Sequence, residues 1–244
     1  MARSASHARP GRCALAATVL LAALLSAGPA LACRLALALG FDVSRSVNAA
    51  AYAIQIEGIR LALRDERVRN AILQPDHGVA LAVFEWAGRA EQTLVADWRV
   101  IGHSGDLDEL DRLLASHNRS HAGFTALGSA LDYGRRLLDR APDCTWQTLD
   151  ISGDGRSNDG PSPAEVYRRA DFGDITVNGL AIGGHESDIA RYYADHVIRG
   201  PGAFVEFART HVDFPEVFLR KLLRELLEQA IGQAPAPPAG ARGG

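Results

Sequence analysis

The sequence of 244 residues predicts a single α/β domain with a doubly wound, mostly parallel sheet flanked by helices. Short apolar runs alternate with helical segments, as in repeated strand–helix–strand units. Polar, glycine-containing loops follow several of these runs, which is where open parallel sheets bind ligands. The length fits one domain of roughly 200 residues. A formal net charge of -3 argues against nonspecific binding to nucleic acid, which needs a basic face.

The first 32 residues have the features of a secretory signal peptide. Three arginines precede an apolar stretch from Cys13 to Leu25, which is shorter than the ~20 residues that span a bilayer. Residues 30–32 read Ala-Leu-Ala, so we predict cleavage after Ala32, with a buried N-terminal helix as the alternative. Cleavage would leave 212 residues, a net charge of -6 and two cysteines. We therefore expect an exported protein, periplasmic or secreted, without a transmembrane segment.

The first half of the mature chain predicts three strands and one long helix between them. The nearly continuous apolar run Arg34–Val43 is typical of a strand buried on both faces. A helix is expected over 47–67, followed by a turn at Gln74–Gly78. Strands are expected over 79–86 and 91–100, joined by a short turn and therefore paired.

The second half continues the alternation. A helix over 104–114 has Ser104 as a plausible N-cap, and a second helix is expected over 125–138. Ser162 and Glu165 form a capping box with Pro163 at the first helical position. The remaining expected elements are strands over 147–152, 175–182 and 203–208, helices over 186–197 and 214–231, and a disordered Pro/Gly/Ala-rich tail over 232–244.

Three of the loops after these strands and before these helices carry oxygen ligands. Asp42, Ser44 and Ser46 follow the first strand, Thr125 opens a helix, and Asp154 stands between two glycines after the strand over 147–152. Alone, the first pattern is often an N-cap and the others are often turns. Carboxylate and hydroxyl oxygens are hard ligands, which suit Mg²⁺, Mn²⁺ or Ca²⁺ rather than zinc. We expect the three loops to converge at one edge of the sheet.

Together, these residues resemble the von Willebrand factor type A (vWA) domain, a Rossmann-like fold with a metal-ion-dependent adhesion site. Asp42, Ser44 and Ser46 match its D-x-S-x-S loop, Thr125 matches its distant threonine, and Asp154 matches its distant aspartate. The aspartate stands in S-G-D-G, where the family more often has T-D-G. The resemblance covers residues 33–231. The export signal with CRLALALGFDVS and TLDISGDGRSNDG resembles an uncharacterised bacterial branch of that superfamily.

The resemblance implies a metal site that binds protein partners without chemical turnover. The hydroxyls of Ser44, Ser46 and Thr125 would bind the ion directly, and Asp42 and Asp154 would act partly through water. The ion is expected to be Mg²⁺, with Mn²⁺ or Ca²⁺ as alternatives. One open position would accept a carboxylate from a partner protein.

Two other classes of function stay open at this point. The first is a metal-dependent hydrolase or phosphatase, although no Gly-x-Ser-x-Gly, H-E-x-x-H or P-loop pattern occurs. The second is a structural domain with an unoccupied site. His185 is expected to be a loop residue rather than a catalyst. Asn158 and Asp159 either line the metal face or form an Asx turn, and we favour the turn.

The two cysteines of the mature chain are expected to form a disulfide. In the resembling fold, the strands that start at Cys33 and after Cys144 are parallel neighbours, so their first residues lie within the ~5.5 Å typical of bonded cysteines. Closing a loop of ~110 residues could stabilise the fold by about 4–5 kcal/mol in the chain-entropy model. The alternative is a lipid on Cys33, but residue 30 is Ala rather than the Leu usual at that distance before a lipidated cysteine.

Overall fold

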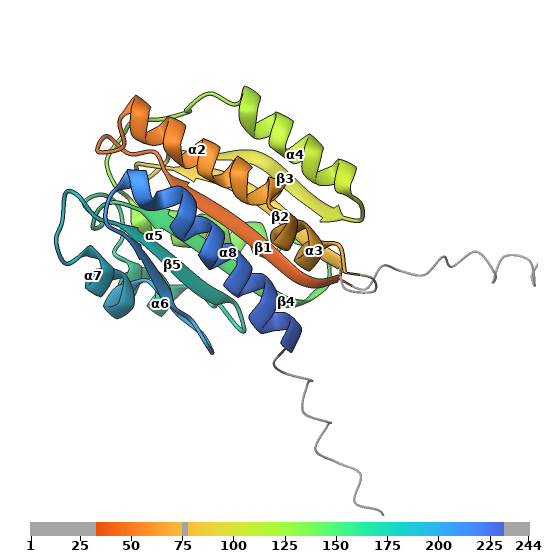
Figure 1. Ribbon diagram of the computed structural model, residues 1–244. Helices are drawn as coiled ribbons and strands as arrows, with labels where there is room; N and C mark the ends of the chain where they lie inside the picture. Colours follow the sequence, from red (N-terminus) through yellow and green to blue (C-terminus); the bar gives the residue numbers. More distant parts are fainter. Residues whose placement is uncertain (1–32, 75–77, 232–244) are drawn as a thin grey trace, which may run out of the picture. The chain divides into compact units, whose positions relative to one another are not determined.

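The computed structural model describes residues 33–74 and 78–231 and contains a six-stranded sheet between two layers of helices (Figure 1). The predicted signal peptide and C-terminal tail lie outside the described residues, as does most of the turn predicted at Gln74–Gly78. The strands are β1 (Cys33–Asp42), β2 (Gly78–Trp86), β3 (Gln92–Ile101), β4 (Cys144–Gly153), β5 (Thr176–Ile182) and β6 (Val205–Ala208). The helices are α2 (Ala49–Arg64), α3 (Glu66–Ile72), α4 (Ser104–Ser116), α5 (Leu127–Leu138), α6 (Pro163–Arg169), α7 (Ile189–His196), the 3₁₀ helix η1 (His211–Asp213) and α8 (Phe214–Ile231).

The sheet has the order β3-β2-β1-β4-β5-β6, and only β3 is antiparallel to its neighbour. The chain therefore runs outward from β1 in one direction and then returns to build the other half from β4. Ligands bind where the strand order reverses in this way, beyond the carboxyl ends of the strands. That point lies between β1 and β4, and the predicted α/β doubly wound sheet is confirmed.

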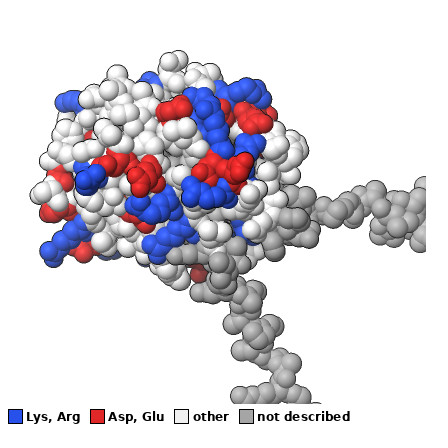
Figure 2. Space-filling model, in the orientation of Figure 1, with Lys and Arg blue, Asp and Glu red and all other residues white. Residues whose placement is uncertain are grey.

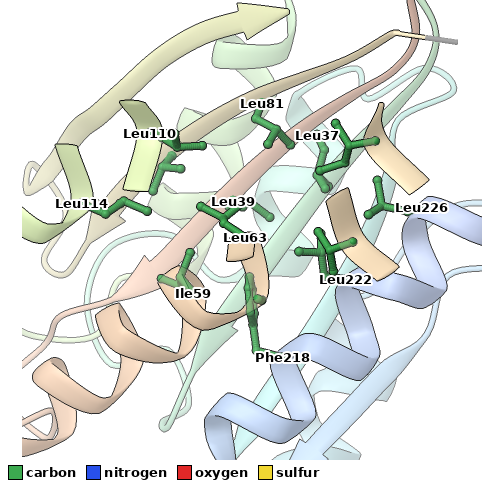
Figure 3. Packing of buried hydrophobic residues seen from close by; sticks show 14 of the residues in the cluster. Leu37, Leu39, Ile59, Leu63, Leu81, Leu110, Leu114, Phe218, Leu222 and Leu226 are labelled. Atoms are coloured by element: carbon green, nitrogen blue, oxygen red, sulfur yellow. The ribbon is translucent and has the colours of Figure 1, made fainter. Parts of the chain in front are cut away.

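Every residue of β1 is buried, because helices cover both of its faces. Leu35, Leu37 and Leu39 alternate with Ala36 and Ala38, so the two sets point to opposite faces. The leucines pack against the layer of α2, α3, α4 and α8, and the alanines face the layer of α5, α6 and α7. Figure 3 shows the first of these cores, where Leu37, Leu39 and Leu81 of the sheet meet Ile59 and Leu63 of α2, Leu110 and Leu114 of α4, and Phe218, Leu222 and Leu226 of α8.

The strands and the C-terminal helix agree with the predictions to within a few residues, but the helix predicted over 47–67 is wrong. It is two helices, because α2 ends at Arg64 and α3 begins at Glu66. Between them, Asp65 has an extended backbone, and its carboxylate accepts a hydrogen bond of 2.9 Å from the Arg67 backbone nitrogen. An aspartate in this role is a strong helix start, which the apolar periodicity did not reveal.

Other helix boundaries also differ from the predictions, and at the starts of α4 and α5 side chains bind nearby backbone groups. The N-cap of α4 is His103 rather than Ser104, and the Asp106 carboxylate accepts from the backbone nitrogens of residues 102 and 103. α5 begins two residues after Thr125, whose backbone is paired with Asn158. α7 begins at Ile189 instead of residue 186. The capping box of α6 is confirmed, whereas η1 was not predicted.

Cys33 and Cys144 form the expected disulfide, with a Cα–Cα distance of 4.4 Å. They face each other in the first pair of the parallel β1–β4 ladder, so the bond joins the amino ends of the two central strands. Because the disulfide uses the Cys33 sulfur, this structure leaves no thiol there for a lipid.

Charged side chains are mixed on the face of the molecule in Figure 2, where basic and acidic residues alternate. This distribution fits the small net charge and shows no basic patch of the kind that nucleic acid requires on that face. Among the residues that the structure describes, no helix is both long and apolar enough to cross a membrane.

One buried group of charges joins the sheet to α8. Lys221, the only lysine of the sequence, has its ammonium nitrogen 2.6 Å from Asp150 of β4 and 2.6 Å from Glu225 of α8. Asn178 of β5 donates a hydrogen bond of 2.8 Å to the same Glu225 oxygen. All three charged side chains are at most 2% exposed. One ammonium thus compensates two carboxylates. Burial raises the pKa of Asp150 to about 7; the charge of Lys221 opposes this shift, and the charge of Glu225 adds to it.

We expect the raised pKa of Asp150 to make the folded protein less stable as pH rises from about 4 to about 7. In that window the folded state holds a proton on Asp150 that the unfolded chain has released. The stabilisation is therefore complete below the pKa of Asp150 in the unfolded chain, and it is lost as pH rises through the pKa of Asp150 in the folded protein. Asp150→Asn should remove about 2–3 kcal/mol from the difference in unfolding free energy between pH 5 and pH 8. Urea unfolding of metal-free wild type and variant at both pH values measures this, and equal pH dependence in the two proteins contradicts it.

Candidate functional site

The loop that follows β1 is organised by its own aspartate. Asp42 ends the strand with its side chain fully buried, and its Oδ1 atom accepts a hydrogen bond of 2.7 Å from the backbone nitrogen of Ser44. This Asx turn reverses the chain at the edge of the sheet. Ser44 is also fully buried, whereas Ser46 is partly exposed, so the two hydroxyls lie on a path from the interior to the surface.

The structure brings the five predicted residues together. The Ser44 and Ser46 hydroxyl oxygens are 3.1 Å apart, and the Thr125 hydroxyl donates to Ser44 at 3.3 Å. The Ser46 hydroxyl donates to Oδ1 of Asp154 at 2.6 Å, across 108 residues of sequence. The convergence follows from the parallel pairing of β1 with β4, which places Asp42 and Asp154 at the same edge.

The two carboxylates of this cluster have no fixed positive charge against them. Asp42 and Asp154 are both fully buried, and the Oδ2 atom of each lacks a hydrogen-bond partner. Burial, and then the charge of Asp154, raise the pKa of Asp42 to about 7. In the part of the chain that the structure describes, no Lys or Arg forms an ion pair with either aspartate. Two buried, uncompensated carboxylates are unfavourable unless a cation joins them, so the orphaned oxygens fit a cation.

The donor chemistry also fits a hard divalent ion. The cluster offers three hydroxyls and two carboxylates, which suit Mg²⁺, Mn²⁺ or Ca²⁺. Within residues 33–74 and 78–231, no three or more His, Cys, Asp and Glu side chains are grouped so as to hold a metal ion. An ion bound here would therefore depend on the hydroxyl oxygens of Ser44, Ser46 and Thr125.

Two residues that sequence reasoning did not assign to the site hold its loops in place. The Arg119 guanidinium donates to the carbonyl oxygens of Val43 and Ser44, each at 2.7 Å. Asn158 accepts from the backbone nitrogen of Thr125 at 2.8 Å and donates its own backbone nitrogen to the Thr125 carbonyl. Asn158 therefore holds the backbone of Thr125 in position. No sequence pattern pointed to Arg119, because its partners are backbone atoms 75 and 76 residues away.

A buried glutamate fixes the loop that carries Arg119. Glu85 of β2 is 1% exposed, and its carboxylate accepts hydrogen bonds from the Tyr52 hydroxyl at 2.7 Å and the Ser120 backbone nitrogen at 3.0 Å. His117 lies 3.2 Å from the same carboxylate. Glu85 thus joins α2, β2 and the loop before Thr125, so the position of Thr125 depends on all three.

Close packing around Asp42 depends on Gly153 of β4. A Cβ atom at Gly153 would lie 2.6 Å from the hydroxyl oxygen of Tyr193 and 3.0 Å from the Asp42 Oδ2 atom. The first contact is shorter than real Cβ atoms show and the second is tight, so the glycine of the S-G-D-G sequence allows β4, Asp42 and α7 to approach closely.

The surface beside the cluster carries aromatic and charged side chains. Phe124 is 56% exposed, and the Arg45 guanidinium lies over its ring at 4.8 Å. Arg156 pairs with Glu186 and Asp188 and lies 5.0 Å from the centre of the Tyr192 ring. His185 lies in the loop before α7, as expected from the sequence.

Several solved structures share this fold at low sequence identity. The proximal thread matrix protein 1 of the mussel byssus, determined with a zinc-occupied MIDAS motif, is 16% identical, with a TM-score of 0.58 over 82% of this chain and 46% of that one. A von Willebrand factor type A protein of Catenulispora acidiphila is 18% identical, with a TM-score of 0.58 over 80% and 43% of the two chains. The PilB minor pilin of Streptococcus sanguinis is 12% identical, with a TM-score of 0.57 over 82% and 62%.

These likenesses establish the fold, and the chain spans less than half the length of the first two proteins. No curated protein matches this chain significantly. A family model described as "Protein of unknown function (DUF1194)" matches residues 32–230, nearly the whole described part. The chain therefore belongs to the DUF1194 family, and its domain has the von Willebrand factor A-like fold.

Proposed function

We propose that this protein binds a divalent cation through Asp42, Ser44, Ser46, Thr125 and Asp154, and that the ion mediates recognition of a partner protein. The observation that carries the proposal is the pair of buried carboxylates without a Lys or Arg partner among the described residues, directly beside three hydroxyl groups. The hard oxygen donors favour Mg²⁺, with Mn²⁺ or Ca²⁺ as alternatives. Bound there, the cation would supply a Lewis-acidic position for an incoming carboxylate.

The protein's own residues would keep that position accessible and rigid. Ser46 is the most exposed member of the cluster, so an approaching group would meet the site beside it. Arg119, Asn158 and Glu85 hold the surrounding backbone by hydrogen bonds, which reduces the conformational entropy lost on binding. Phe124 and Arg45 offer an exposed aromatic and cationic contact of the kind common in protein interfaces.

Export completes the proposed function. We propose that residues 1–32 are a cleaved signal peptide and that residues 33–231 form the exported domain. The disulfide between Cys33 and Cys144 supports this proposal, because such bonds persist in oxidising compartments. The named neighbours include a minor pilin and a byssus protein, which also fits a role outside the cytoplasm.

Calorimetric titration with Mg²⁺ and Mn²⁺ tests the cation site. We expect one ion per chain for the wild type, and binding at least tenfold weaker for Asp42→Ala and Ser46→Ala, because each removes an oxygen from the cluster. Asp108→Ala is a matched control, since this aspartate of α4 is 61% exposed and pairs with Arg69 of α3. Absence of binding by the wild type, or equal affinity in all variants, contradicts the proposal.

Partner capture from an envelope extract tests the second half of the proposal. Immobilised wild type should retain a protein in Mg²⁺ and release it in EDTA, because the partner's carboxylate needs the ion. Ser46→Ala should retain little of it, and Asp108→Ala should behave as the wild type. Equal retention with Mg²⁺ and EDTA would show that recognition does not depend on the cation.

A further inference from the structure

A fourth loop, which follows β6, reaches Asp154 of the cluster. His211 begins η1, the short 3₁₀ helix between β6 and α8, where Thr210 accepts a hydrogen bond from the backbone nitrogen of Val212. The imidazole is 14% exposed, and its Nε2 atom is fully buried without a hydrogen-bond partner. This nitrogen lies 3.9 Å from Oδ2 of Asp154, which is also buried and also without a partner.

The distance between these two unpartnered atoms is too long for a direct hydrogen bond and short enough for one bridging ion. A direct hydrogen bond between nitrogen and oxygen needs about 2.7–3.2 Å, so 3.9 Å is too long. A water bonded to both atoms at ~2.8 Å with a near-tetrahedral angle would hold them about 4.6 Å apart, which is farther than observed. Divalent ions such as zinc bind imidazole nitrogen and carboxylate oxygen at about 2.0–2.2 Å each, and at a near-tetrahedral angle one ion would hold these two atoms about 3.4 Å apart. The observed 3.9 Å lies nearer to this ion-bridged distance than to the water-bridged one.

Asp154 connects this pair to the hydroxyl cluster. Its Oδ1 atom accepts a hydrogen bond from the Ser46 hydroxyl, and its Oδ2 atom is the oxygen nearest to His211. We propose that the Nε2 atom of His211 is, together with Asp154 and the hydroxyl oxygens, a direct ligand of the divalent ion bound at this cluster, with Asp42 acting through water. The inference rests on the cation site of the proposed function and adds a nitrogen to its oxygen ligands.

A nitrogen ligand changes which ion the site prefers. Imidazole binds Mn²⁺, Co²⁺ and Zn²⁺ readily, whereas Mg²⁺ and Ca²⁺ prefer oxygen. His211 therefore shifts the preference from Mg²⁺ or Ca²⁺, which the hydroxyls and carboxylates alone favour, toward these transition-series ions and Zn²⁺. Affinity in that series should rise from Mn²⁺ through Co²⁺ to Zn²⁺.

Pulsed electron paramagnetic resonance of bound Mn²⁺ tests the nitrogen ligand directly. In the wild type, the spin-echo signal should carry modulation from a coordinated imidazole nitrogen. His211→Gln should abolish it, while His185→Gln, in the loop before α7, and His103→Gln, at the exposed N-cap of α4, should retain it. His211→Gln should also weaken Zn²⁺ binding at least tenfold and change Mg²⁺ binding less than threefold.

The outcomes separate this inference from the proposed function. If Mn²⁺ binds the wild type, is lost in Ser46→Ala, and shows no nitrogen modulation, the cation site stands and the role of His211 is wrong. If the modulation survives in His211→Gln and disappears in His185→Gln, the assignment to His211 is also overturned. If the wild type binds neither Mn²⁺ nor Zn²⁺, both proposals fail together. A wild-type spectrum without nitrogen modulation overturns the inference even where a variant folds poorly.

Discussion

β1 and β4 lie side by side in parallel register, and the candidate site depends on this pairing. The ladder runs from Cys33 opposite Cys144 to Phe41 opposite Ser152, so the disulfide fixes one end, while Asp42 and Asp154 emerge just beyond the other. A slip of one residue would turn every side chain of β1 to the opposite face. The leucines that pack against α2 and α8 would then face the wrong layer, and the two aspartates would no longer meet.

The structure contains two pairs of buried carboxylates near β1 and β4, and the negative charges of the two pairs are neutralised differently. Asp150 and Glu225 share the ammonium group of Lys221, which is 2.6 Å from each. Asp42 and Asp154 have hydroxyl groups and backbone donors but no Lys or Arg in the described part of the chain. Asp42 and Asp154 thus lack the Lys or Arg side chain that neutralises Asp150 and Glu225. Burial of charge is tolerated only with such compensation, which is why a bound cation explains the cluster well.

The layers and strands could be predicted from the sequence because buried parallel strands need continuous apolar runs, such as the one from residue 34 to 43. Asp42, Ser44 and Ser46 could be found as a local pattern, and Thr125 and Asp154 through resemblance to a family. Arg119, Glu85 and His211 could not be found, because their roles depend on contacts with residues far away in the chain. The break at Asp65 was missed because a capping aspartate interrupts a helix without interrupting its apolar periodicity.

We propose that Asp42 and Asp154 are held close together for a cation, and that their proximity destabilises the metal-free fold. Thermal unfolding of Asp42→Asn at pH 8, with and without Mn²⁺, measures both parts, because asparagine keeps the acceptor for the Ser44 nitrogen and removes the charge. The metal-free variant should unfold at a temperature equal to or above that of the wild type. Mn²⁺ should raise the unfolding temperature of the wild type only, because an ion that binds the folded state stabilises it. A less stable variant that responds to Mn²⁺ as strongly as the wild type would contradict the account.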